Sequence, residues 1–196
     1  MISIRHHLSN SFYDPDTVLN EKAQAVWRYL NKENVVGAGA VRGKSITKRA
    51  QEFLTIVESH EHACHYSRRA ARRHSALLKA LLNDGTLEKL ITSGPRELDA
   101  LADTLSPILA NADFEKCGTH AAFSELLQNK FFNYKAYRDS DFCSSLYIEL
   151  KFTTVTCPYC NEYPVKVILR SKGKDKKPIL HFDLDHFYPK SKYPFL

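Results

Sequence analysis

The sequence predicts an α+β protein, with a mostly helical region over residues 1–150 and a strand-rich segment over residues 151–196. Two observations support this. Apolar residues recur every three or four positions through the first region, which is the period of an amphipathic helix. Near Tyr147 the pattern changes to short runs of β-branched and aromatic residues separated by turn formers, which is typical of strands. We therefore expect a domain boundary between residues 140 and 152.

The first helix is expected after Asp14, because an acidic cap followed by proline is a strong helix start. Residues 83–85, Asn-Asp-Gly, should end a third helix, and Ser-Gly-Pro at 93–95 should precede a fourth. A further helix is expected from about Asp113 to Tyr134. The stripes that predict the first four helices are Leu19, Ala23, Val26, Trp27 and Leu30; Ile46, Ala50, Phe53, Leu54 and Val57; Ala70, His74, Leu77, Leu78 and Leu81; and Leu98, Leu101 and Leu105.

The C-terminal segment is expected to form a β-hairpin. Residues 151–156 are rich in β-formers and lead into Cys157-Pro158-Tyr159-Cys160. Residues 163–170 and 178–185 are predicted strands, and the lysine-rich residues 171–177 are the turn between them. The pair is expected to expose its lysine-rich tip to solvent.

Positive charge is concentrated in the same segment. Residues 151–196 contain nine Lys and Arg against four acids, which is +5 of the total net charge of +6. A basic segment of this kind suits a surface that binds a polyanion. A solubilising lysine-rich turn explains the charge equally well.

No apolar stretch has the roughly 20 residues of a membrane span, and the first residues lack the apolar run of a signal peptide. We therefore expect a cytoplasmic protein with no membrane partner. Five cysteines are an odd number for a disulfide framework, which indicates a reducing compartment. Cys64, Cys117 and Cys143 lie in helical patterns and are interpreted as small buried hydrophobic residues.

The Cys157-x-x-Cys160 pair admits a redox, a metal-binding or an incidental interpretation. Redox chemistry needs the first cysteine at a helix N-terminus, whereas Pro164 and the β-branched residues 165–168 oppose a helix. Only 36 residues follow Cys160, too few for the rest of a thioredoxin-like sheet. Two thiolates in a tight turn are half of a tetrahedral zinc site, which requires two further ligands. His181 is one candidate for such a ligand.

The most specific pattern is Leu184-Asp185-His186-Phe187-Tyr188-Pro189-Lys190-Ser191-Lys192-Tyr193-Pro194. This run resembles the DHF-x-PKS-x-YP element of bacterial HNH (ββα-metal) endonucleases, in which it follows a CxxC knuckle and a β-hairpin in the order seen here. The resemblance covers about residues 155–196. Within that superfamily the chain is similar to the HNH subunits of antiphage systems such as the Septu type, in which a helical region precedes the nuclease.

The resemblance implies a role for each motif residue. His186 is the general base that activates water, since histidine titrates near neutral pH. Asp185 is the ligand of the catalytic Mg²⁺ or Mn²⁺, hard ions that prefer oxygen. Cys157 and Cys160 are two of four structural Zn²⁺ ligands. We add Lys190 and Lys192 as phosphate contacts, with ordinary solvated lysines as the alternative interpretation.

The sequence departs from the HNH pattern at its C-terminal end. After this run HNH nucleases continue with an asparagine, a second CxxC-type pair and a closing helix that completes the metal site. Residues 1–196 hold only the N-terminal half of the domain. Either the sequence is part of a longer one, or the gene is truncated, or another chain supplies the remainder, and we expect little or no nuclease activity from this polypeptide alone.

The resemblance implies endonucleolytic cleavage, with DNA as the expected substrate and bacterial defence as the expected role. The helical region is expected to dock a protein partner such as an ATPase subunit. A non-catalytic HNH-like module that binds nucleic acid or a partner is the alternative. A zinc-stabilised helical adaptor is a third possibility.

Three weaker patterns lie in the helical region. Residues 38–45 fit a loose P-loop pattern, but a loop that caps the next helix is the preferred interpretation because a buried strand is lacking before it. The histidines of 60–65 are interpreted as surface residues. The arginines at 68, 69, 72 and 73 are expected either to follow a DNA backbone or to pair with acidic helices.

Overall fold

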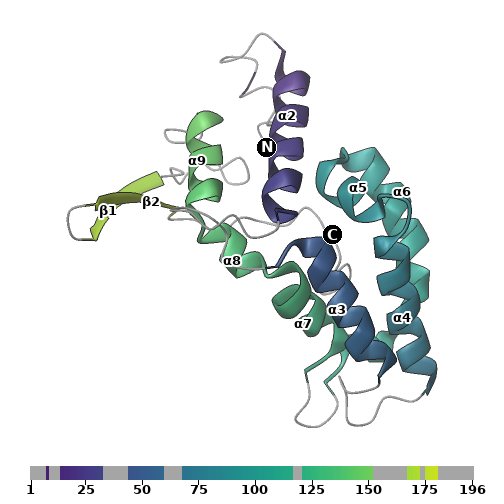
Figure 1. The fold of residues 1–196 in the computed structure, drawn as a ribbon. Coiled ribbons are helices and arrows are strands. Elements are labelled where there is room, and N and C mark those ends of the chain that lie inside the picture. Colours follow the sequence, from purple (N-terminus) through teal and green to yellow (C-terminus); the bar gives the residue numbers. More distant parts are fainter. Residues whose placement is uncertain are drawn as a thin grey trace.

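The computed structural model describes Leu8 and residues 14–32, 44–59, 68–116, 121–151, 167–172 and 175–180, with backbone only for Lys130 and for the last two ranges. None of the described helices is long and apolar enough to cross a membrane. The elements (Figure 1) are α2 Pro15–Leu30, α3 Ile46–Glu58, α4 Arg68–Leu82, α5 Thr86–Thr92, α6 Pro95–Leu105, η1 Ser106–Ile108, η2 Asn111–Phe114, α7 Phe123–Leu126, the π-helix η3 Leu127–Phe132, α8 Tyr134–Arg138, α9 Asp141–Glu149, β1 Val167–Lys172 and β2 Asp175–Leu180.

Local capping chemistry sets the starts of the first two long helices. The Asp14 carboxylate accepts hydrogen bonds from the amides of Asp16 (3.2 Å) and Thr17 (3.4 Å), and Pro15 takes the first position of α2. The Ser45 hydroxyl accepts from the Lys48 amide at 3.2 Å and starts α3. The four helices predicted from apolar stripes are confirmed as α2, α3, α4 and α6. The expectation that residues 38–45 cap the next helix is confirmed at Ser45.

The helix expected from about Asp113 to Tyr134 is wrong in its first part. Asp113 lies in the 3₁₀ turn η2, and the next helix, α7, starts only at Phe123. The reason is that the Asp113 carboxylate accepts a hydrogen bond from the Ala110 amide at 2.8 Å, which closes a tight turn instead of opening a long helix.

Most of the apolar core lies between α3 and α4, with α5, α6, α7 and η3 packed around them. α3 and α4 lie side by side, and α7 lies beside the middle of α3 (Figure 1). Phe123 of α7 is fully buried and stacks on Phe53 of α3 with ring centroids 5.9 Å apart. We call this set the large core: Ile46, Ala50, Phe53, Val57, Leu77, Leu78, Leu81, Leu87, Leu90, Leu105, Phe123, Leu127 and Phe131.

A second, smaller cluster joins α2 to α9. Its buried residues are Leu8 and Leu150, and we call it the small cluster. Tyr29 of α2 stacks on Phe142 of α9, with ring centroids 4.0 Å apart and planes 8° apart. Near the same end of α2, partly buried Trp27 packs on the large core, whereas Val18 and Leu19 near the start of α2 pack on the small cluster. α2 therefore bridges the two apolar clusters.

The expected α+β fold class is wrong. Helices account for 81% of the residues whose side chains are described, and none of those residues lies in a strand. β1 and β2 form one antiparallel pair with Val167 opposite Leu180 and Lys172 opposite Asp175. A pair of strands is too small a layer to bury a core, and the helical stripes bury themselves against one another instead. The described fold is therefore α-helical.

Candidate functional site

The residues of the predicted nuclease site lie outside the described residues. They are Cys157, Cys160, Asp185, His186, Lys190 and Lys192, and the same is true of His181 and of the histidines at 60–65. The described backbone between them is the strand pair. Because Val167 is opposite Leu180, the chain enters β1 and leaves β2 at the same end of that pair.

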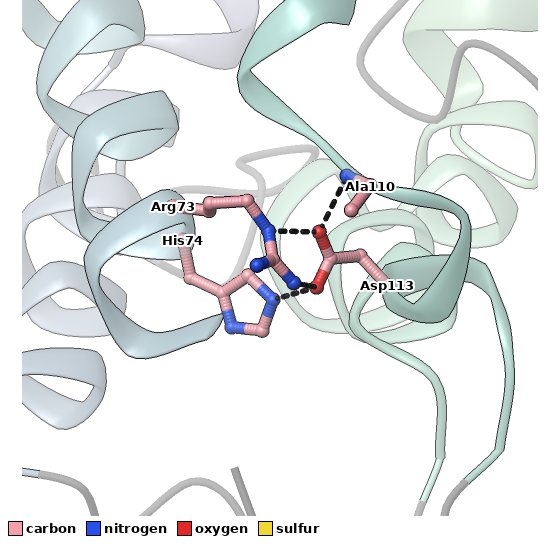
Figure 2. Close-up of polar contacts among 4 residues, drawn as sticks. All are labelled: Arg73, His74, Ala110 and Asp113. Atoms are coloured by element: carbon pink, nitrogen blue, oxygen red, sulfur yellow. Dashed lines mark hydrogen bonds and ion pairs between the residues drawn. The ribbon is translucent and has the colours of Figure 1, made fainter. Parts of the chain in front are cut away.

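A second cluster of titratable groups, in the helical region, is described in full. Arg73 and His74 of α4 both reach the Asp113 carboxylate in η2 (Figure 2). Arg73 binds it in a bidentate manner, Nε to Oδ2 at 2.9 Å and Nη2 to Oδ1 at 2.8 Å. His74 Nε2 lies 2.8 Å from Oδ1, and the Ala110 amide donates to Oδ2 at 2.8 Å. Each carboxylate oxygen therefore receives two contacts.

Packing holds the histidine of this network in place. The His74 side chain has no exposed surface and stacks on Phe123, with ring centroids 3.6 Å apart and planes 4° apart. The Asp113 side chain is 1% exposed, whereas that of Arg73 is 29% exposed. The arginine therefore links the buried pair to the surface of α4.

The hydrogen bonds decide the charge of Asp113. Burial disfavours the ionised carboxyl, but the hydrogen bonds from His74, Arg73 and the Ala110 amide outweigh it and hold the pKa of Asp113 well below its usual range. The same carboxylate raises the pKa of the Arg73 guanidinium. Asp113 is therefore an anion that compensates the positive charge of α4.

A histidine paired with an aspartate also occurs in sites that activate a nucleophile. Such a site needs a ring edge that a substrate can approach, and His74 is fully enclosed. The network instead fastens η2 to α4 across 40 residues of sequence. We assign it a structural role.

The sequence contained one indication of this network. His74 falls on the apolar stripe of α4, and a buried histidine requires a hydrogen-bond partner. The partner itself was missed, because Asp113 was interpreted as a helix start. Among the described residues, the expectation that arginines of 68–73 pair with acids is confirmed for Arg73.

The other arginines of α4 are on its solvent-exposed side. Arg68, Arg69 and Arg72 are exposed, and no hydrogen bond or ion pair joins them to the residues that the structure describes. Farther along the same helix Lys79 pairs with Glu58 of α3 at 2.7 Å. Three of the five basic residues of α4 therefore present uncompensated charge to solvent.

Cys143 of α9 is buried, as its helical context predicts. Burial raises the pKa of its thiol to about 11, which disfavours the reactive thiolate. Burial likewise raises the pKa of the neighbouring Tyr137 hydroxyl. Cys143 is therefore a packing residue; Cys64 and Cys117 lie outside the described residues.

Metal binding at the predicted cysteines and aspartate stays a prediction. Within the described residues no three His, Cys, Asp or Glu side chains gather as metal ligands, and the predicted ligands are not among those residues. The sequence and the fold were also compared with known proteins. No protein-family model, no curated protein and no solved structure matches the chain.

Proposed function

We propose that the chain carries part of an HNH-type endonuclease site that hydrolyses phosphodiester bonds of DNA with the help of a divalent metal ion. The observation that supports the proposal is the sequence run from Asp185 to Pro194 after the Cys157-x-x-Cys160 pair. Its residue types match the chemistry: a histidine for water activation, a neighbouring carboxylate for a hard cation, and two thiolates for zinc.

In this proposal His186 accepts a proton from the attacking water, whose oxygen bonds to phosphorus while the P–O bond to the leaving nucleotide breaks. The leaving oxygen takes its proton from solvent. Asp185 would hold Mg²⁺ or Mn²⁺, which would supply positive charge to neutralise the phosphoryl oxygens. Cys157 and Cys160 contribute two thiolates to a structural Zn²⁺. Lys190 and Lys192 contact backbone phosphates, which positions the substrate without reading its sequence.

Two further features support a site of this kind. The chain enters β1 and leaves β2 at the same end of the strand pair, and in the sequence the cysteine pair precedes β1 and the Asp-His pair follows β2. Residues 151–196 also carry +5 of the net charge, as a surface for a polyanion requires. We extend the proposal to a cytoplasmic defence role, with the helical region docked on a protein partner such as an ATPase subunit.

The test is cleavage of supercoiled plasmid by the complete product of the gene. We expect nicking that requires Mg²⁺ or Mn²⁺ and stops in EDTA. His186→Ala should slow it by about 10²–10⁴-fold, the usual contribution of a general base. Asp185→Asn should raise the metal concentration needed. His62→Ala, a histidine expected at the surface, is the matched control and should cleave as the wild type does. Metal-dependent cleavage that survives His186→Ala would reject the proposal.

A second candidate function is nucleic-acid binding without cleavage. The exposed Arg68, Arg69 and Arg72 of α4 favour it, since they provide charge for a phosphate backbone independently of any metal site. Plasmid that is bound but remains intact with Mg²⁺ and with Mn²⁺ would support this function and exclude the first.

A further inference from the structure

We propose that the exposed face of α4, formed by Arg68, Arg69, Arg72 and Lys79, binds the phosphate backbone of double-stranded DNA. Nucleic acid is chosen as the polyanion on the basis of the proposed function. The binding itself requires neither a metal ion nor cleavage. We call these four residues the α4 basic face.

Helix geometry places the four cations together. At 3.6 residues per turn they fall within an arc of about 100°, and at 1.5 Å per residue they extend over roughly 16 Å of the helix. All four are exposed, and the opposite side of α4 faces the large core. The buried residues of that opposite side are Ala70, Ala71, His74, Leu77, Leu78 and Leu81.

The surrounding acids leave most of this charge uncompensated. The sequence of α4 contains no acidic residue. Asp113 forms an ion pair with Arg73 at one side of this face. Glu58 forms an ion pair with Lys79 and also accepts a hydrogen bond from the Ser75 hydroxyl at 3.0 Å. In the described part of the chain no acid pairs with Arg68, Arg69 or Arg72.

This arrangement costs free energy in the isolated protein. Arg68 and Arg72 are four residues apart, and like charges at that spacing repel along a helix. The contrast with Arg73 is direct, because that neighbour is held by a buried carboxylate. A phosphate backbone would relieve the repulsion, and guanidinium groups bind phosphate oxygens through paired hydrogen bonds. Charge complementarity therefore identifies a polyanion as the occupant of this face.

The location of α4 leaves room for a large ligand. α4 lies at an outer edge of the helical assembly, on the side opposite the strand pair in the view of Figure 1. Contacts of arginines with phosphates position a duplex without reading its bases. We therefore expect binding that is independent of sequence and strongly dependent on salt.

The test compares two triple variants of the full chain by fluorescence anisotropy, using a labelled 20-base-pair duplex in EDTA. The first is Arg68→Gln with Arg69→Gln and Arg72→Gln. The control is Lys32→Gln with Lys89→Gln and Arg96→Gln, which removes the same charge from exposed positions elsewhere. Glutamine preserves helix propensity, and circular dichroism and thermal melting check the fold.

Three lost phosphate contacts should weaken binding on the order of 10- to 100-fold at 0.1 M salt and reduce the slope of log K against log salt by about 2.7. The control should stay within about threefold of the wild type. Equal losses in both variants would show a general effect of net charge and overturn the proposal. Stronger binding of polyglutamate than of duplex through these arginines would assign the face to an acidic protein and also overturn it.

The outcome is separable from that of the proposed function. Arginine-dependent binding in EDTA together with intact plasmid in Mg²⁺ would uphold the α4 basic face and reject the nuclease. Cleavage whose KM for DNA is unchanged in the arginine variant would reject the face and leave the nuclease standing.

Discussion

The two apolar clusters differ in how they are held together. The large core joins α3, α4, α5, α6, α7 and η3 through thirteen buried residues, and the Arg73–His74–Asp113 network ties its edge to η2. In the described part of the chain the small cluster has two buried leucines, Leu8 before α2 and Leu150 directly after α9. An aromatic stack and an ion pair between Lys22 and the exposed side chain of Glu149 also join α2 to α9. Exposed ion pairs contribute little to stability, so among the described residues the small cluster depends on fewer buried apolar side chains than the large core does.

The difference has a consequence for dynamics. Segments with few buried apolar contacts open locally at a smaller free energy than the core does. We therefore expect α9 to open before α3 and α4. The proposed DNA-binding helix α4 belongs to the stable part, which keeps its arginines in a fixed arrangement.

The largest effect is expected from Asp113→Ala. This change removes the carboxylate that binds Arg73 and His74 and leaves the Ala110 amide without its acceptor, so it should lower the free energy of unfolding by about 3–5 kcal/mol. Urea unfolding followed by circular dichroism measures this. Asp139→Ala, at an exposed aspartate, is the control. A loss below about 1 kcal/mol would mean that the network does not fasten the large core.

A pair of leucine truncations compares the clusters directly. Leu78→Ala in the large core should cost about 2–5 kcal/mol, because the site is fully enclosed and leaves a cavity. Leu150→Ala, at a position with 8% exposure, should cost no more than about 2 kcal/mol, the low end of that range. In Leu150→Ala, the acceleration of amide hydrogen exchange should be confined to α9 and α2. Equal costs, with exchange accelerated throughout the chain, would contradict the distinction between the clusters.

Acid should weaken the large core through Asp113. The pKa of this carboxyl is lower in the fold than its reference value of 3.8, so its stabilisation is complete above that value and is lost as the pH falls below it. Between pH 5 and pH 2 the wild type should lose on the order of 2 kcal/mol more than Asp113→Asn does. If the free energies of unfolding of the two proteins fell in parallel with pH, the lowered pKa of Asp113 would be contradicted.

The smallest effect is expected at a helix cap. Ser45→Ala removes the acceptor of the Lys48 amide and should lower stability by about 1 kcal/mol. Ser93→Ala, whose side chain makes no capping bond in the described residues, should change stability by less than about 0.5 kcal/mol. Comparing the melting temperatures of the two variants separates the loss of the capping hydrogen bond from the effect of replacing a serine by alanine elsewhere.

The parts of the fold that sequence patterns predicted are those set by local chemistry. Asp14-Pro15 and the Asn83-Asp84-Gly85 turn bounded helices correctly, and the stripes identified the buried faces of α3 and α4. Asp84 and Gly85 both adopt left-handed backbone, with φ of 47° and 69°, which ends the helical path after α4. The seven-residue helix α5 was missed, because so short a segment displays little periodicity.

Two predictions were wrong: the helix start at Asp113, which tertiary contacts override, and the α+β fold class, which rested on the strand-like pattern near the C-terminus. The Asp113 carboxylate binds His74 and Arg73, which lie 39 and 40 positions earlier in the sequence. Nothing in the local sequence around Asp113 indicates that pairing. The strand-like residues 151–196 suggested a second structural layer, whereas the described core is built from helices alone. The nuclease residues were identified from motif chemistry, and they remain predictions because they lie outside the described residues.

The most direct test of the proposed nuclease is chemical rescue of its general base. The complete gene product with His186→Gly is assayed for Mg²⁺-dependent plasmid cleavage, with and without added imidazole. We predict that the variant is slower than the wild type by about 10²–10⁴-fold and that imidazole restores part of the rate, since it replaces the missing base. Cleavage by His186→Gly at the wild-type rate without imidazole would contradict the central role of this histidine.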